Sequence, residues 1–445
     1  MAEVVKVGMV SLGCPKNQCD AELMLAKIAD AGYKIVNEAG LADVVVINTC
    51  GFIQSAKEEA IEEIMEAINR KNDGINKKII VTGCLAERYQ QQMDEEFPEV
   101  DAVLGIAKND DIVAAINSVL LDKRVIAFGD KECHNMEGNR LQSTLPHYAY
   151  LRIADGCSNC CSYCAIPMIR GKMRSRKMEN IIEEAKALAA NGVKELVIVA
   201  QDVTAYGIDL YKKYALAELL KELCKIDGIK WIRLLYCYPE RITDELIEVI
   251  KTEEKVLNYI DVPIQHCNDI ILEAMNRKSD KKSLIELFTK LRREIPDIVL
   301  RTTLITGFPG ETEEQFTELA EFVNEIKFQR LGCFAYSEEE DTPAALMPDQ
   351  VDEGERQRRA DIITNEQEIR MGDYYADFVE KEFEVVCEGF DRYSDMYVGR
   401  SMHFAPELDG LVYFTSAKEN RPVIGDFITV KITDILENNL LGEQV

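Results

Sequence analysis

The stretch Gly156-Cys157-Ser158-Asn159-Cys160-Cys161-Ser162-Tyr163-Cys164 decides the fold and the chemistry of this chain. Cys157, Cys161 and Cys164 form a C-x3-C-x2-C triplet, so one tight loop carries three thiols. Iron–sulfur cubanes are usually held by four cysteines. A loop that supplies only three leaves one iron open to bind a small molecule, which is the arrangement that a catalytic cluster needs. The spacing therefore predicts a [4Fe-4S] cluster at this loop.

Zinc and an inert core are the alternatives for the same cysteines. Cys160 could complete a set of four thiolates for a structural zinc ion. Zinc sites prefer two separated C-x2-C pairs, however, and adjacent Cys160 and Cys161 would be an awkward pair of ligands. Buried thiols without a ligand are the third interpretation. The spacing favours the cluster.

The composition describes an acidic chain with room for several domains. Its 445 residues allow two or three domains, and a hydrophobic content of 47% can build their cores. The 52 basic and 79 acidic residues give a formal net charge of −27. Such a charge repels nucleic-acid phosphates unless basic residues gather locally, and it favours a basic partner. A solvated acidic surface is the simpler explanation.

Cysteine usage and hydropathy indicate the compartment. Residues 1–6 lack the charged-then-apolar pattern of a secretory signal, and no run approaches the ~18 apolar residues of a membrane span. The 14 cysteines then indicate metal or redox chemistry rather than disulfides. We expect a cytoplasmic protein of an oxygen-poor cell, without a membrane partner.

Residues 1–130 alternate short apolar runs with amphipathic stretches, which predicts a doubly wound α/β domain on a parallel sheet. Strands are expected at residues 4–12, 43–48, 78–82 and 101–104, and helices at 20–31, 55–70 and 110–121. Cys14, Cys50 and Cys84 follow the first three strands, in small-residue turns. The carboxyl ends of parallel strands meet at one edge, so these cysteines should converge on a second, three-thiolate cluster site. Each alone would more commonly be core, as we expect for Cys19.

Residues 131–145 are polar and are expected to form a linker, followed by a second α/β series over residues 146–375. Six strands are expected, at residues 148–154, 195–200, 231–236, 259–262, 299–305 and 330–336. Six units are too few for an ordinary eight-stranded barrel and predict a partial, laterally open, TIM-like (βα)6 barrel. The cysteine loop follows its first strand, so the cluster is expected at the barrel mouth.

Polar residues near the ends of these strands are candidates for cofactor binding. They are Gln201 and Asp202 after the second strand, Gln265 and His266 after the fourth, Arg301 in the fifth, and Gly307, Gly310 and Glu311 in the turn that closes it. Glycines there allow close approach to a ligand, and the amides that open the next helix suit a carboxylate. The alternative is a turn capped by Thr312, with His266 as a structural residue.

Five positive charges fall within residues 170–177, directly after the cysteine loop. A solvated loop is one interpretation. A grip on an acidic group or on a carboxylate-bearing substrate is the other, because arginine suits bidentate carboxylate recognition.

Residues 376–445 are expected to form a small antiparallel, OB-like β-barrel after an acidic connection and a long helix. Strands are expected at residues 383–388, 396–400, 411–414 and 426–435. Residues 380–445 hold 13 acidic and 6 basic residues, the wrong sign for phosphates, so we expect no direct sequence-specific nucleic-acid binding.

Together these motifs resemble the radical S-adenosylmethionine (SAM) methylthiotransferases over essentially the whole chain. The motifs of Cys14, Cys50 and Cys84 resemble the auxiliary-cluster domain of that family. Its radical SAM core resembles residues 147–176, which read H-Y-A-Y-L-R-I-A-D-G-C…C-x2-C-A-I-P…R-G-K-x-R-S-R. The tail resembles its TRAM module. The run S-L-G-C-P-K-N at residues 11–17 is similar to the RimO branch, which modifies an aspartate of ribosomal protein S-twelve. The tRNA-modifying MiaB branch has a different residue pair after the first cysteine. An acidic tail favours the same branch, because ribosomal proteins are basic.

The resemblance implies two [4Fe-4S] clusters and SAM. Cys157, Cys161 and Cys164 would hold the cluster that binds the amino acid end of SAM and reductively cleaves it to a 5′-deoxyadenosyl radical, which takes a hydrogen from the β-carbon of the aspartate. Cys14, Cys50 and Cys84 would hold the auxiliary cluster that carries the sulfur, which a second SAM methylates. A reductant such as flavodoxin or ferredoxin and a sulfur donor are further expected partners.

The chain departs from the family pattern at Cys160, at Asp341 and at Gln18-Cys19. None of these is an expected cluster ligand, so only the fit of the substrate is affected. Two other functions stay open at this point: the same chemistry on a tRNA adenosine, as in the MiaB branch, and a non-catalytic iron–sulfur protein that binds ribosomes or carries electrons.

Overall fold

Runs of β-branched residues build the central strands of the amino-terminal sheet. In the computed structural model, which describes residues 4–417 and 421–445, every residue of the apolar strand Val44–Thr49 is buried. The sheet is parallel, in the order β2-β1-β3-β4-β5-β6. Its strands are β1 (Lys6–Ser11), β2 (Lys34–Val36), β3 (Val44–Thr49), β4 (Lys78–Gly83), β5 (Ala102–Leu104) and β6 (Val125–Ala127). The prediction did not include the edge strands β2 and β6, which are three residues long and, unlike β5, only partly buried.

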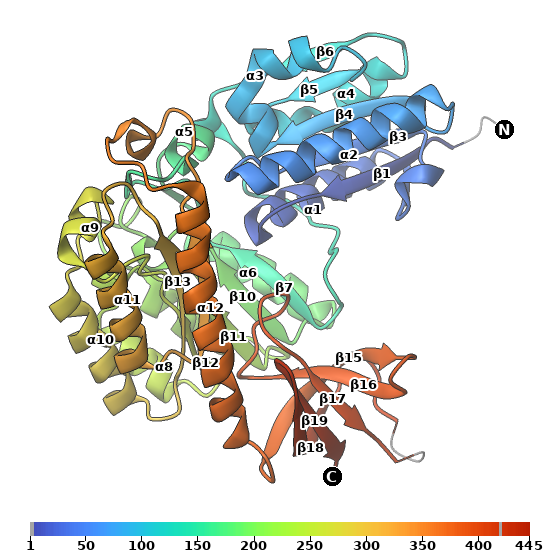
Figure 1. The fold of residues 1–445 in the computed structure, drawn as a ribbon. Helices are drawn as coiled ribbons and strands as arrows, with labels where there is room; N and C mark the ends of the chain where they lie inside the picture. The colour runs from blue at the N-terminus through green and yellow to red at the C-terminus, as the bar shows by residue number, and fades with distance from the viewer. Residues whose placement is uncertain (1–3, 418–420) are drawn as a thin grey trace.

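Helices cover both faces of this sheet (Figure 1). They are α1 (Pro15–Asp30), α2 (Gln54–Asn72), α3 (Cys84–Glu96) and α4 (Ile112–Val119). Ile64 of α2 packs with Val45 on one face, whereas Met24 of α1 and Ile116 of α4 pack with Val46 on the other. Successive strand residues point to opposite faces, so a fully apolar strand needs a helix layer on each side. The predicted doubly wound domain is confirmed.

Six parallel strands form the second sheet, in the order β14-β13-β12-β11-β10-β7. They are β7 (Tyr148–Arg152), β10 (Glu195–Val199), β11 (Trp231–Leu234), β12 (Val256–Asp261), β13 (Val299–Thr306) and β14 (Arg330–Ala335). The helices are α5 (Ile166–Arg170), α6 (Met178–Ala190), α7 (Leu216–Cys224), α8 (Asp244–Thr252), α9 (Asp269–Ala274), α10 (Lys281–Glu294) and α11 (Glu313–Ile326). Across the described chain β7 and β14 do not pair with each other, so the predicted open (βα)6 barrel is confirmed.

The long helix α12 (Glu353–Ala376) runs along the barrel to a small carboxy-terminal barrel (Figure 1). Its strands are β15 (Glu382–Asp391), β16 (Met396–Ser401), β17 (Val412–Thr415), β18 (Phe427–Leu436) and β19 (Asn439–Gln444), closed in the order β15-β16-β17-β19-β18. The predicted small β-barrel is confirmed. It has one more strand than expected, β19, and this strand pairs with β17 in parallel while the other pairs are antiparallel.

The loop between β16 and β17 fills the interior of the (βα)6 barrel near the amino-terminal ends of its strands. The hydroxyls of Tyr148 and Tyr150 each donate to a carboxylate oxygen of Glu407 at 2.8 Å. The hydroxyl of Tyr259 donates to Oδ2 of Asp409 at 2.7 Å. The carboxyl ends of the strands therefore remain the end where a ligand can enter. No helix in the described part of the chain is both long and apolar enough to cross a membrane.

His403, in this loop, gives the fold a specific acid sensitivity. Burial, assisted by the charges of Arg330 and Arg233, lowers the pKa of His403 to about 4. The unfolded chain, with an ordinary histidine pKa near 6.5, therefore binds the proton more tightly. The contribution of neutral His403 to the free energy of unfolding is fully present above about pH 6.5, and it declines by about 3 kcal/mol as the pH falls to 4.

Urea unfolding between pH 4 and 7 measures this decline, and His403→Gln is expected to remove most of it. The carboxyl of Glu195, whose pKa burial raises but Arg400 and Arg233 lower overall to about 2, titrates below this window. A variant that retains the full decline would contradict the assignment to His403.

Candidate functional site

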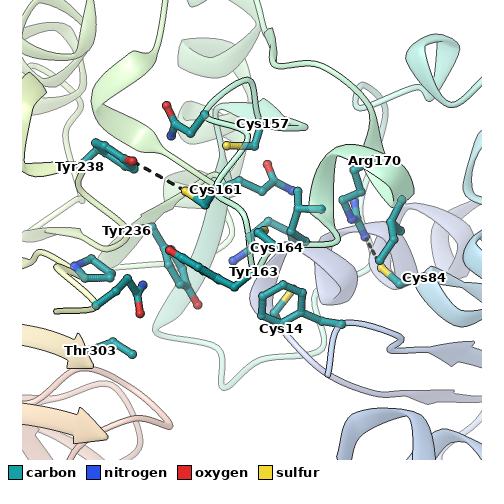
Figure 2. Close-up of a pocket in the computed structure, with 18 of the residues that line it drawn as sticks. Cys14, Cys84, Cys157, Cys161, Tyr163, Cys164, Arg170, Tyr236, Tyr238 and Thr303 are labelled. Carbon is teal, nitrogen blue, oxygen red and sulfur yellow. Dashed lines mark hydrogen bonds between the residues drawn. The ribbon is translucent and has the colours of Figure 1, made fainter. Parts of the chain in front are cut away.

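One cavity of about 350 Å³ lies between the amino-terminal domain and the mouth of the barrel (Figure 2). Its walls include both predicted cysteine sets: Cys14, Cys50 and Cys84 from the amino-terminal domain, and Cys157, Cys161 and Cys164 from the barrel. All six are free thiols. Cys84 also packs against Ala165, the neighbour of Cys164, so the two cysteine-bearing segments pack against each other. The sequence predicted each set but not that they share one cavity.

The three amino-terminal cysteines converge because each follows a neighbouring strand of one sheet. Cys14 follows β1 and caps α1, Cys50 follows β3, and Cys84 follows β4 and opens α3. The turn at Gly13 has a φ of +86°, and a Cβ there would lie 2.7 Å from Cβ of Cys50. Only glycine combines that backbone conformation with such close packing. The predicted convergence is confirmed.

The barrel cysteines lie on the loop that follows β7 and a two-residue strand, β8 (Ala154–Asp155), which pairs with β9 (Arg174–Ser175). Backbone hydrogen bonds hold the loop, from Cys157 N to the carbonyl of Gly171 at 3.1 Å and from Cys164 N to that of Cys161 at 3.1 Å. The hydroxyl of Tyr238 lies 3.7 Å from Sγ of Cys161 (Figure 2).

Cys160 is exposed and does not line the cavity. Among the described residues, no group of three or more His, Cys, Asp or Glu side chains could hold a single metal ion. A zinc site that uses Cys160 therefore has no support in the arrangement.

Two amide oxygens in the cavity wall fit a bound cofactor. Oε1 of Gln201 and Oε1 of Gln265 are buried and accept no hydrogen bond from a described residue. Buried acceptors are normally satisfied, so a ligand amine or hydroxyl is the natural partner. Gln265 and Tyr236, both in the wall, also have positive φ angles of 71° and 62°. Such strained backbone in non-glycine residues concentrates at ligand sites.

Burial and nearby charge set the thiol pKa values. Burial raises the pKa of Cys157 to about 11 and that of Cys84 to about 12. Burial would also raise the pKa of Cys14, but the positive charges of Lys16 and Arg170 outweigh it and lower that pKa overall. Metal ligands must be thiolates, so cluster assembly displaces protons from this cavity.

Of the other predicted cofactor-binding residues, the structure brings Gln201 and Gln265 to the cavity, while Asp202, His266, Arg301, Gly307, Gly310 and Glu311 lie outside its lining. Asp202 stands behind the wall. Its carboxylate accepts hydrogen bonds from Asn159 at 3.0 Å and from the hydroxyl of Thr204 at 2.6 Å. Because Asn159 lines the cavity, Asp202 positions the cysteine loop.

Arg301 does not lie at the carboxyl end of its strand. It is the third residue of β13 and binds Asp261 at 2.8 Å, so its role in cofactor binding stays a prediction. A buried ion pair inside a barrel has no sequence signal.

The turn after β13 is held to α12. Glu311 binds Arg359 at 2.8 Å and accepts the amide of Gly307 at 3.0 Å, and Nε2 of His266 lies 3.5 Å from its carboxylate. Thr312 caps α11 as the alternative interpretation expected. A role for these residues in cofactor binding stays a prediction.

Two of the five basic residues, Arg170 and Arg176, are buried and grip acidic groups of the protein itself, as one interpretation expected, whereas Lys172 and Lys177 are exposed. Arg170 is buried and binds Asp155 at 3.1 Å and Asp20 at 2.8 Å, and its Nη2 lies 3.5 Å from Sγ of Cys84 (Figure 2). Arg176 is also buried and pairs with Glu184 at 2.6 Å. Arg170 therefore joins the amino-terminal domain to the barrel, and Arg176 pairs within the barrel. A run of charges cannot show which of its members are buried.

Arg170→Met is expected to destabilise the folded protein by about 3 kcal/mol, because it leaves Asp20 and Asp155 buried without this cation. Anaerobic unfolding in urea measures the change. Lys172→Met, at an exposed lysine of the same segment, should stay within about 0.5 kcal/mol of the wild type. An Arg170→Met protein as stable as this control would contradict the role of the network.

Several lining residues were missed. They are Lys16, Asn17, Phe52, Asn159, Tyr163, Ile166, Ile169, Tyr236, Cys237, Tyr238, Pro263 and Arg277. Tyr236, Cys237 and Tyr238 follow β11, so the strand-end rule that found Gln201 could have found them. Arg277 follows α9 and had no such signal.

Three family models match consecutive parts of the chain. They are the Uncharacterized protein family UPF0004 over residues 6–105, the Radical SAM superfamily over residues 151–323 and the TRAM domain over residues 379–445. The chain is 49% identical over 438 residues to a ribosomal protein uS12 methylthiotransferase RimO of Caldanaerobacter subterraneus subsp. tengcongensis, which covers 98% of this chain and 99% of the relative. A protein of the same name from Clostridium botulinum is 47% identical over 442 residues, covering 99% and 98%.

The chain belongs to the RimO family of ribosomal protein uS12 methylthiotransferases. The predicted family, the radical SAM core and the TRAM module are thereby confirmed, as are [4Fe-4S] clusters and SAM as cofactors of a RimO-type enzyme.

A solved structure shows the same fold outside the RimO family. The radical S-adenosylmethionine methyltransferase TsrM from Kitasatospora setae, with cobalamin and a [4Fe-4S] cluster bound, matches with a TM-score of 0.57 over 77% of each chain. Its sequence identity is 13%, so the likeness concerns the fold alone.

Proposed function

We propose that this chain places a methylthio group on the β-carbon of an aspartate in uS12, the S-twelve protein of the small ribosomal subunit. The observation that carries the proposal is the single cavity shared by the two cysteine sets. A carbon held there lies next to both sets, so hydrogen removal and sulfur transfer can occur at one position. The names of the relatives supply the substrate.

Each cysteine set would hold one [4Fe-4S] cluster, with Cys157, Cys161 and Cys164 leaving an iron open for SAM. When bound, these groups supply the electron, the radical and the sulfur that an unactivated C–H bond requires. The protein orients and encloses them. Gln201 and Gln265 would accept hydrogen bonds from the cofactor, and the hydroxyl of Tyr238 faces the sulfur of Cys161.

The predicted residues outside the lining are proposed to shape the site from behind its wall. These are Asp202, His266, Arg301, Gly307, Gly310 and Glu311. The contact of Asp202 with Asn159 supports this role for the cysteine loop, and the contacts of Glu311 support it for the turn after β13.

Partners and compartment follow from the same proposal. A net charge of −27 suits a basic ribosomal protein. We propose a cytoplasmic enzyme that takes electrons from a reductant such as flavodoxin or ferredoxin and sulfur from a separate donor. We also propose domain boundaries at 1–130, 131–145, 146–375 and 376–445, supported by the end of β6 at Ala127, the start of β7 at Tyr148 and the end of α12 at Ala376.

Mass spectrometry of uS12 and of tRNA from cells with and without this gene tests the proposal. We expect deletion to remove the methylthio group from the uS12 aspartate and to leave methylthio-adenosines in tRNA unchanged. The wild-type gene should restore the modification, and a gene carrying Cys157→Ala should not. An unchanged uS12 beside a lost tRNA modification would replace this function with the tRNA alternative.

A further inference from the structure

Lys16 presents a cation to the cavity from the amino-terminal domain. It is the second residue of α1, two positions after Cys14, and it lines the cavity with 7% of its surface exposed. Its Nζ lies 3.5 Å from the ring centroid of Tyr236, which follows β11 of the barrel. The side chain therefore reaches from the domain of one cysteine set to the wall that carries the other.

The ammonium of Lys16 lacks the carboxylate partner that a buried lysine usually has. Lys57, which is equally buried, pairs with Glu339 at 3.1 Å. Within the described residues Lys16 has no carboxylate within 4.0 Å, and its neighbours are the ring of Tyr236 and the thiol of Cys14. Burying a charge without a partner is costly, so an anion that enters with a ligand would complete this site.

The two other cations in the cavity wall are already engaged. Arg170 is held by Asp20 and Asp155. Arg277 donates to the carbonyl of Pro263 at 2.7 Å, and its guanidinium lies 4.0 Å from the ring centroid of Tyr238, beside Cys161. Nε of Arg277 is also buried without a partner among the described residues, but Arg277 lies on the side of the barrel cysteines, whereas Lys16 lies on the side of the amino-terminal cysteines.

We propose that Lys16 binds the carboxylate of the target aspartate and selects aspartate over neutral side chains. This inference rests on the proposed function. The carboxyl carbon of aspartate is bonded directly to the β-carbon, so a cation that fixes the carboxylate also fixes the reacting carbon within the cavity. Asparagine has the same shape without the charge, and an ammonium offers it no charge-assisted pair. Lys16 acts by binding and orienting.

The test compares the wild type with Lys16→Met, which keeps the unbranched apolar stem and removes the charge. Both proteins are reconstituted anaerobically as full chains and given uS12 or uS12 with asparagine at the target position. For the natural uS12, kcat/KM should fall about 10- to 100-fold, the usual range for a hydrogen bond to a charged group. The preference for aspartate over asparagine should fall by the same factor, and Lys16→Arg should restore much of it.

Binding without turnover gives a second readout. The affinity of the reconstituted, unreduced enzyme for a uS12 peptide should fall about tenfold or more in Lys16→Met, and that for the asparagine peptide should not change. The iron content and the affinity for SAM should match the wild type. Lys16→Gln provides the same comparison if the methionine variant does not fold.

Lys27→Met is the matched control, because Lys27 lies on the same helix and pairs with Asp110 away from the cavity. Lys27→Met should leave unchanged both the preference for aspartate over asparagine in turnover and the affinities for the two peptides. A Lys16→Met protein that keeps the aspartate preference overturns the inference, as does one that loses SAM affinity or iron while the preference persists. A wild-type protein that does not modify uS12 overturns the proposed function and this inference with it.

Discussion

Replacing Cys157, Cys161 and Cys164 together with alanine is expected to lower 5′-deoxyadenosine formation from SAM by more than about 1,000-fold. These thiols are the barrel's contribution to the cavity, and without them no cluster can deliver an electron to SAM there. Reconstituted protein, dithionite and SAM, followed by chromatography of the products, measure the loss. The amino-terminal thiols remain, so about half of the iron should be retained.

Cys160→Ala is the control for this prediction. Cys160 is adjacent to Cys161 but exposed and outside the cavity, so its loss should leave the cleavage of SAM unchanged. If the triple variant still produced 5′-deoxyadenosine at the wild-type rate, the loop would not hold the catalytic cluster.

The second large effect concerns Cys14, Cys50 and Cys84. Their joint replacement with alanine is expected to lower the rate of methylthio transfer to uS12 by more than about 1,000-fold. The rate of SAM cleavage should stay within about tenfold of the wild type. The two outcomes separate because the sulfur-bearing site and the SAM-cleaving site belong to different domains. Mass spectrometry of uS12 and assay of 5′-deoxyadenosine in the same reaction measure both.

Cys133→Ala is a suitable control for the amino-terminal set, because Cys133 is exposed and does not line the cavity. Unchanged iron and sulfide in the triple variant would show that these three residues hold no cluster. Continued transfer of the methylthio group would show that the sulfur enters elsewhere.

The convergence of the amino-terminal cysteines could be predicted because residues that follow the strands of a parallel sheet lie at the same edge of that sheet. Cys14, Cys50 and Cys84 each follow a strand of one parallel sheet, and such strand ends share an edge. The barrel set, Cys157, Cys161 and Cys164, could be predicted from its C-x3-C-x2-C spacing alone. The same rule found Gln201 and Gln265 in the cavity wall and would have found Tyr236, which also follows a strand.

The meeting of the two sets could not be predicted, because it depends on how the domains pack. Arg170 joins them through Asp20, which lies 150 positions earlier in the chain. From the sequence, Arg170 was one of five charges in a segment expected to face solvent or to grip an acidic group or a substrate, with no sign of which acidic group it would bind. Likewise, nothing in the sequence showed that Glu407 of the carboxy-terminal domain would enter the barrel, or that the linker residue His134 would bind Asp20 at 2.9 Å.

The central claim is that two cysteine sets hold two iron–sulfur clusters at one cavity, one of them open to SAM. The most direct measurement is the metal and sulfide content of the protein purified without oxygen, together with electron paramagnetic resonance of the reduced form before and after SAM is added. We predict about eight irons and eight sulfides per chain, with SAM altering the signal of the barrel cluster. A protein that holds zinc and no iron at the loop of Cys157, Cys161 and Cys164 would contradict it.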